Sequence, residues 1–275
     1  VLFVNGCDWP GFGDPAALVP PPTPKLFRNL GDWKFEDVTE KVGLNAVMYG
    51  MGAAVGDYDN DGHPDVFISC VGQHRLFRNA GGKKFDDVSA AAGVGGGPDL
   101  PSADKDTFLA WKDAIPFGSS ATFVDYNGDG RLDLFVCHYV TWSPAIDKSI
   151  NSTLEGGRRT FVQPRDFDGS QCSLYRNEGN GKFRDVSAEA GVHVSEKEGT
   201  DAGARQRPVG KALGVVLCDP DADGWPDLLV ANDSVRNFFF HNVERNGARV
   251  FEEKGYPLGA AYADGGVARA GMGID

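Results

Sequence analysis

The segment Asp57-Tyr58-Asp59-Asn60-Asp61-Gly62-His63-Pro64-Asp65 sets the pattern on which this chain of 275 residues is built. The same spacing, Asp-x-Asp/Asn-x-Asp-Gly-x-x-Asp, occurs again at 125–133 and 219–227. Each copy has oxygen-bearing side chains at positions 1, 3, 5 and 9 and glycine at position 6, the ligand order of a calcium loop. An EF-hand would carry a glutamate at its twelfth position and enter a helix. Here that position falls in an apolar run, so we interpret the copies as shorter loops between two strands.

We predict that each loop binds one Ca²⁺ through these side chains and through the backbone carbonyl of the residue at position 7. Turn chemistry alone could explain a single Asp-Gly pair, but three clusters of carboxylates would repel one another without a cation. Magnesium fits less well, because it prefers a small octahedral shell and keeps its waters. The predicted ligands are Asp57, Asp59, Asp61, His63 and Asp65, then Asp125, Asn127, Asp129, Arg131 and Asp133, and finally Asp219, Asp221, Asp223, Trp225 and Asp227, with His63, Arg131 and Trp225 acting by backbone carbonyl.

The composition is acidic, with a formal net charge of −12. The chain has no basic stripe, which argues against binding to nucleic acid or to an anionic membrane. It also has no apolar run long enough for a transmembrane helix. The five cysteines form no metal-binding or haem-attachment spacing. Cys70 and Cys137 end apolar strands and read as buried thiols, whereas Cys7 and Cys172 lie in loop-like segments and could pair.

The repeat extends beyond the acidic loop. Apolar strands flank each loop, a short aromatic strand that ends in Asn follows, and a strand that begins Phe-x-Asp or Phe-x-Glu completes the unit. The aromatic strands are 76–79, 174–177 and 239–242, and the last strands begin at Phe85, Phe183 and Phe251. Short strands at fixed intervals predict an all-β fold, a β-propeller of four-stranded antiparallel blades with calcium loops between the first and second strands.

The predicted organisation is a single propeller region over residues 1–275. It comprises a half blade at 1–50, blades at about 51–117, 118–209 and 210–265, and the start of a further blade at 266–275. We interpret the chain as a segment of a larger ring. The alternative is a four-bladed ring closed by both termini. The unpaired blade edges of a segment would also allow self-association.

Long insertions are expected on one face. The links from second to third strand are long at 5–24 and 139–173, and the links between units are long at 95–118 and 193–210. In an antiparallel blade all of these lie opposite the calcium loops. Recognition usually resides in such loops. The candidate ligand-binding residues there are Trp111, Trp142, Arg158 and Arg159.

The acidic loops, the aromatic strands that end in Asn and the strands that begin Phe-x-Asp resemble FG-GAP/VCBS repeats. The likeness is to repeats of the kind found in ASPIC/UnbV-containing proteins related to cartilage acidic protein. Segments 210–214, 225–233 and 268–273 carry the likeness to that group, although the ASPIC/UnbV module itself is not visible. The resemblance covers nearly the whole chain. It implies a calcium-bound propeller of about seven or eight blades, secreted, at the cell surface or periplasmic.

Two classes of function remain open. The first is a calcium-stabilised binding or adhesion scaffold that recognises a protein or a glycan through the insertion face. The alternative is a carbohydrate-active propeller, either a lectin or a polysaccharide lyase. The chain has no Gly-x-Ser-x-Gly and no His-Glu-x-x-His motif, so an enzyme has little support. His138, which follows a strand beside a long insertion, is the one histidine that we would test as a catalytic residue.

Overall fold

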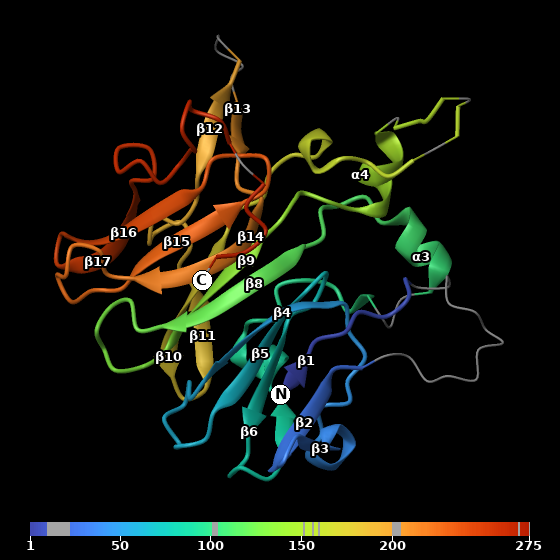
Figure 1. Ribbon diagram of the computed structural model, residues 1–275, viewed down its shortest axis with the longest axis vertical. Coiled ribbons are helices and arrows are strands. Elements are labelled where there is room, and N and C mark those ends of the chain that lie inside the picture. Colours follow the sequence, from blue (N-terminus) through green and yellow to red (C-terminus); the bar gives the residue numbers. More distant parts are fainter. Residues whose placement is uncertain are drawn as a thin grey trace.

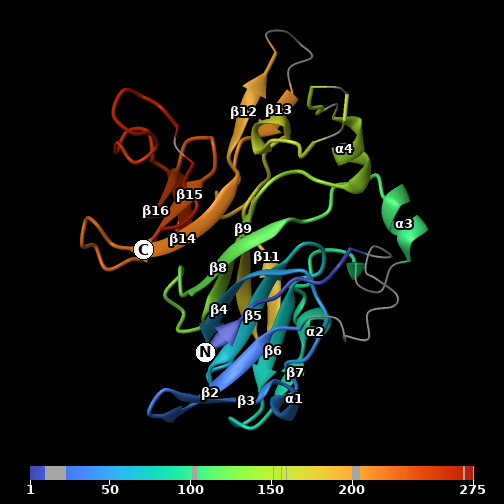
Figure 2. The same cartoon turned by 45° about the vertical axis from the view of Figure 1, so that its right-hand side comes forward.

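The computed structural model describes residues 1–9, 23–100, 104–150, 152–155, 157–158, 160–199, 205–268 and 270–274. Within this part the regular structure is mostly antiparallel β-sheet, with a few helices of one or two turns (Figures 1 and 2). None of these helices has the length and apolar character needed to cross a lipid bilayer.

Three sheets each contain four strands that pair with their neighbours in chain order (Figure 1). The first has β4 (Gly50–Gly56), β5 (Asp65–Cys70), β6 (Arg75–Asn79) and β7 (Phe85–Asp87). The second has β8 (Gly118–Val124), β9 (Asp133–His138), β10 (Ser173–Gly179) and β11 (Lys182–Asp185). The third has β14 (Ala212–Cys218), β15 (Asp227–Asn232), β16 (Phe238–Arg245) and β17 (Ala248–Glu253). A partial sheet of β1 (Leu2–Phe3), β2 (Lys25–Gly31) and β3 (Lys34–Asp37) precedes them.

This topology confirms the prediction of all-β, four-stranded antiparallel units. It also confirms that each acidic loop joins the first strand of a unit to the second, since 57–65, 125–133 and 219–227 connect β4 to β5, β8 to β9 and β14 to β15. The described strands form an open series of sheets and do not close into a ring.

The sheets stack face to face, which explains the continuous apolar runs of their second strands. Leu134 and Val136 of β9 lie in the core shared with the first sheet, whereas Phe135 and Cys137 lie in the core shared with the third. Side chains on a strand alternate between its two faces. Both faces of the second sheet are covered, so every residue of β9 is buried.

A recurring Asp-Val-Ser/Thr motif ends three of the four sheets. In the first complete sheet, Asp87 accepts from the backbone N–H of Ser89 at 3.0 Å, and the Ser89 hydroxyl accepts from the N–H of Leu76 at 2.8 Å. Thr39 and Ser187 accept in the same way from Leu26 and Leu174. The motif turns the chain into α1 (Thr39–Val42), into α2 (Ser89–Ala92) and into the corresponding turn after β11.

The long insertions lie on the edge opposite the acidic loops, as predicted. They contain α3 (Lys105–Ala110), α4 (Pro144–Ser149), the 3₁₀ turn at Pro164–Asp166 and the hairpin of β12 (Ser195–Glu198) and β13 (Arg205–Pro208). Figure 1 shows α3, α4 and the hairpin extending away from the sheets along this edge. Most of the earliest insertion, residues 10–22, lies outside the described residues.

Each aromatic strand ends in a buried asparagine, and in the second and third sheets its side chain also joins the sheet to the preceding one. The Nδ2 of Asn177 donates to the carbonyl of Leu132 at 3.0 Å in its own sheet and to the carbonyl of Tyr58 at 2.8 Å in the preceding loop. Asn242 repeats the arrangement, with its Nδ2 2.9 Å from the carbonyl of Tyr126. Glycine permits the first strands to approach closely, because a Cβ on Gly52 would lie 2.2 Å from the carbonyl oxygen of Ser119.

We expect Asn177→Ala to lower the free energy of unfolding by about 2–4 kcal/mol, because it removes the amide that donates to the buried carbonyl of Tyr58 and to the partly buried carbonyl of Leu132. Asn79→Ala is the matched control. The Nδ2 of Asn79 donates to the carbonyl of Pro64 at 3.0 Å and makes no hydrogen bond to another sheet among the described residues. We expect Asn79→Ala to lower the free energy of unfolding, measured by urea denaturation, by about 1 kcal/mol less than Asn177→Ala does. Equal losses for the two variants would contradict the inter-sheet role.

Candidate functional site

The three acidic loops share one backbone conformation. The residue at position 4 has a left-handed φ in each loop, 57° for Asn60, 73° for Gly128 and 58° for Ala222. The glycine at position 6 is also left-handed in each, with φ between 79° and 86°. Glycine adopts this region without steric cost, which explains its place in all three copies.

The carboxylate at position 1 organises each turn. In the first loop, Asp57 accepts from the N–H groups of Asp61 at 3.0 Å and Gly62 at 2.8 Å. Asp125 and Asp219 accept from the corresponding N–H groups at 2.9–3.1 Å. The N–H at position 7 then donates to the carboxylate at position 5 in every loop. The same hydrogen bonds therefore fold the three loops.

The aspartate at position 9 is buried in all three loops. Its Oδ1 accepts from the backbone N–H of the asparagine that ends the aromatic strand, at 2.7 Å in each copy. In the first two loops its Oδ2 accepts from the N–H at position 2, that of Tyr58 at 3.1 Å or Tyr126 at 3.4 Å. These carboxylates tie the acidic loop to the third strand of the sheet.

The carboxylates at positions 1, 3 and 5 converge. Those of Asp57, Asp59 and Asp61 lie within 4.8 Å of one another, as do those of Asp219, Asp221 and Asp223. The second loop has Asn127 at position 3, and its amide donates to Asp129 at 3.2 Å. Two of the loops thus present three carboxylates to one small volume, and the middle loop presents two carboxylates and an amide.

Basic side chains offset part of this charge. Arg78 contacts Asp59 at 2.5 Å and Asp61 at 3.0 Å in the first loop. Arg131 pairs with Asp129 in the second. In the third, His241 lies 3.1 Å from Asp227 and 3.8 Å from Asp221. Each loop therefore holds a basic group beside its carboxylates.

The donor set fits a hard cation such as Ca²⁺, and the hydrogen bonding supports that fit. Among the described residues, two buried carboxylate oxygens lack any hydrogen-bond partner, Oδ1 of Asp59 and Oδ2 of Asp227, and both belong to acidic loops. Asp227 differs from its two counterparts because position 2 of its loop is Pro220, which has no N–H to donate. An oxygen ligand for a cation would account for both atoms.

Burial also raises the pKa of two of these aspartates. It raises the pKa of Asp65 to about 6 and that of Asp133 to about 7, against the opposing effect of the backbone N–H groups that each accepts. Neighbouring loop carboxylates raise both further. A bound divalent cation would favour the ionised forms.

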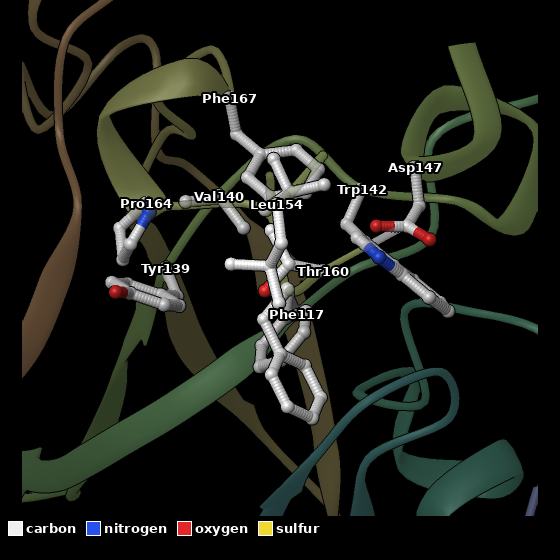
Figure 3. A pocket seen from close by; sticks show the side chains of 11 residues that line it. Phe117, Tyr139, Val140, Trp142, Asp147, Leu154, Thr160, Pro164 and Phe167 are labelled. Carbon is white, nitrogen blue, oxygen red and sulfur yellow. The ribbon is translucent and has the colours of Figure 1, made fainter. Parts of the chain in front are cut away.

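The insertion edge carries a cavity of about 680 Å³ with a largely aromatic and aliphatic lining. Figure 3 shows the rings of Phe117, Tyr139 and Phe167 around it, with Val140 and Leu154 between them. Phe161 also lines it and is 94% exposed. The hydroxyl of Tyr139 donates to Asp233 at 2.5 Å, which holds that ring in place. The full lining is Phe117, Tyr139, Val140, Trp142, Asp147, Leu154, Thr160, Phe161, Val162, Pro164 and Phe167.

The structure brings together two of the four predicted ligand residues, Trp111 and Trp142, which pack against the same hydrophobic cluster. Trp142 lines the cavity and stacks on Trp9 with a centroid distance of 5.2 Å. Trp111 does not line the cavity, although it packs with Trp142 against the cluster that includes Leu100, Phe108 and Ile115. Arg158 is exposed and does not line the cavity, and Arg159 lies outside the described residues. Most of the cavity wall was missed, because Val140, Leu154 and Phe167 carry no motif.

His138 is buried beside His74, with their Nε2 atoms 3.2 Å apart. Nδ1 of His74 accepts from the backbone N–H of Cys70 at 3.0 Å, so its proton resides on Nε2 and is donated to His138. His138 in turn donates from Nδ1 to the carbonyl of Gln171 at 2.8 Å. Burial lowers the pKa of both, that of His74 to about 3. Both ring nitrogens of His138 are therefore engaged, Nε2 with the first sheet and Nδ1 within the second.

Comparison with known proteins supports the repeat assignment. No curated protein matches the chain significantly. Residues 16–68 match the family model of an FG-GAP-like repeat, a range that includes β2, β3, β4, the first acidic loop and most of β5. The chain thus contains an FG-GAP-like repeat within a series of four-stranded antiparallel sheets.

Proposed function

We propose that this chain is a calcium-stabilised binding scaffold, built as a segment of a β-propeller, that recognises a protein or glycan partner through its insertion edge. The sheets would be its blades, and a secreted, cell-surface or periplasmic location would supply the calcium that loops of this kind need. An FG-GAP-like repeat suggests a scaffold of the extracellular binding or adhesion type. The likeness to ASPIC/UnbV-containing proteins does not lead us to propose any enzymatic activity, because the ASPIC/UnbV module itself is not visible in the sequence.

One observation carries the proposal: the described long insertions gather on the edge opposite the acidic loops, where a cavity with an apolar lining opens. Rigid sheets that hold variable loops are a common basis for recognition. Cavities of this size and lining are typical of binding sites. The acidic loops would stabilise the sheets, and the opposite edge would bind the partner.

A carbohydrate-active propeller is the second candidate. The exposed ring of Phe161 and the half-buried ring of Trp142 could stack on a sugar. The cavity has few polar groups to pair with sugar hydroxyls, since Tyr139 is engaged with Asp233. This favours a partner that presents an apolar group.

Calcium should raise the melting temperature of the metal-free protein. Binding to the native state alone stabilises it by mass action, and three sites at millimolar Ca²⁺ predict a rise of about 5 °C or more. Magnesium should give a smaller rise. The measurement is differential scanning fluorimetry of desalted protein, and an unchanged melt would refute structural calcium.

The variant Asp221→Asn tests the third loop by itself. Asp221 is exposed, and among the described residues its carboxylate accepts one long hydrogen bond, at 3.4 Å from the N–H of Asp223, and lies 3.8 Å from His241. Its loss should therefore barely change the metal-free melt, yet remove about one third of the calcium-induced rise. Asp113→Asn, at an exposed carboxylate on the insertion edge, is the control and should retain the full rise.

The calcium effect should also depend on pH. Asp65 and Asp133 have folded pKa values of about 6 and about 7, above their unfolded values. In the metal-free protein their contribution to stability is greatest at low pH and is lost as pH rises through 6 to 7. Calcium requires the ionised forms, so the calcium-induced rise should be largest near pH 8 and shrink towards pH 5. Melting curves with and without calcium give this profile, which a constant rise would contradict.

Partner binding should depend on the insertion edge. A glycan array and a panel of purified extracellular proteins, probed with the calcium-loaded protein, would identify the partner. Binding should fall at least about tenfold in Phe161→Ala, because an exposed ring at a contact is lost. Trp33→Ala is the matched control, since Trp33 is equally exposed, at 94%, but lies in the β2–β3 turn on the acidic-loop side. If Trp33→Ala lost binding and Phe161→Ala kept it, the binding site would lie on the acidic-loop side, and the proposal would be refuted.

A further inference from the structure

The second sheet places two cysteines opposite each other on neighbouring strands. β9 and β10 pair antiparallel, with Val136 opposite Ser173. Beyond the end of β10 the same register continues, because Val140 pairs with Gly169 in an isolated bridge. Between these two points the register sets Cys137 directly opposite Cys172.

The histidine beside this pair fixes the register there. His138 donates to the carbonyl of Gln171 at 2.8 Å, one step along both strands from the cysteines. The strands are thus held together on either side of Cys137 and Cys172. Directly opposite residues of an antiparallel pair have Cα atoms about 4.5–5.5 Å apart, which is within the range that a disulfide spans.

Both cysteines also point to the same side. Cys137 and Cys172 are 0% and 2% exposed, and both belong to the core between the second and third sheets, with Phe135 and Leu174. Cys7 packs in a different cluster, with Tyr49 and Trp9, so the alternative Cys7–Cys172 pairing suggested by their loop positions is wrong. Both thiols are reduced in the structure.

We propose that Cys137 and Cys172 form a cross-strand disulfide when the chain folds in the presence of a disulfide oxidant. A thiolate of one cysteine attacks the oxidant, for example glutathione disulfide, and releases one glutathione thiol. The second cysteine then attacks the mixed disulfide and releases the other. The two protein thiols are oxidised and one small disulfide is reduced to two thiols, so atoms and electrons balance.

The disulfide would form while the chain is folding, before the core that contains both cysteines has closed. Burial, with the neighbouring thiol of Cys172, raises the pKa of the Cys137 thiol well above its usual value, so little thiolate is present once the core has closed. The link would close the long insertion between β9 and β10, which carries α4 and the cavity. It would therefore restrict the unfolded chain and anchor the base of the cavity wall.

The test is refolding of the reduced, denatured chain in a mixture of oxidised and reduced glutathione, with refolding in reduced glutathione alone as the reference. Free thiols are alkylated after unfolding, and peptides are mapped by mass spectrometry without reduction. We expect a linked pair of peptides that contain Cys137 and Cys172. We also expect a melting temperature higher by on the order of 5 °C, a gain that dithiothreitol removes from the unfolded and refolded protein.

Two variants make the result decisive. Cys172→Ser should abolish both the linked peptides and the gain in melting temperature, whereas Cys218→Ser, at a partly exposed cysteine in β14, should retain both. Complete alkylation of Cys137 and Cys172 in the natively refolded, oxidised protein would overturn the proposal. Linkage of either cysteine to Cys7, Cys70 or Cys218 would overturn it equally.

Discussion

The hydrogen bond between the aspartate at position 9 of each acidic loop and the backbone N–H of an asparagine is the contact on which the architecture depends. It recurs at 2.7 Å in all three sheets. It joins the turn between the first two strands to the end of the third strand. The asparagine side chain then reaches the loop of the preceding sheet. In the second and third sheets, a single pair of residues thus couples the folding of the acidic loop to the stacking of the sheets.

This coupling places ionised groups in a buried setting, which is costly unless each oxygen is satisfied. Backbone N–H groups satisfy most of them, and the exceptions in the described part of the chain, Asp59 and Asp227, occur where a cation would complete the shell. The proposed calcium therefore has a structural reason at these loops beyond the count of carboxylates. It would relieve repulsion among groups that the fold forces together.

The opposite edge is organised by different forces. Aromatic packing anchors the long insertions, with Trp9 stacked on Tyr49, Phe108 and Trp142. The neutral pair of His74 and His138 joins the first and second sheets below them. Ion pairs such as Arg207 with Asp168 at 2.6 Å also contribute on this edge, and it carries an open cavity with a largely apolar lining. The separation of the acidic loops from the long insertions follows from the antiparallel topology, which puts alternate connections on opposite edges of each sheet.

The sequence alone determined the four-stranded units, the position of the acidic loops and the edge that carries the insertions, because these depend on local turn chemistry and on patterns that repeat along the chain. It also pointed to the loop carboxylates by their spacing. The cavity wall, the partner of Cys172 and the pairing of His74 with His138 could not be read from it. Each depends on residues far apart in the chain that meet only when strand register and sheet stacking bring them together, and a one-residue change in register would separate them. The tertiary structure therefore decided the contacts, whereas the repeat decided the framework that makes them possible.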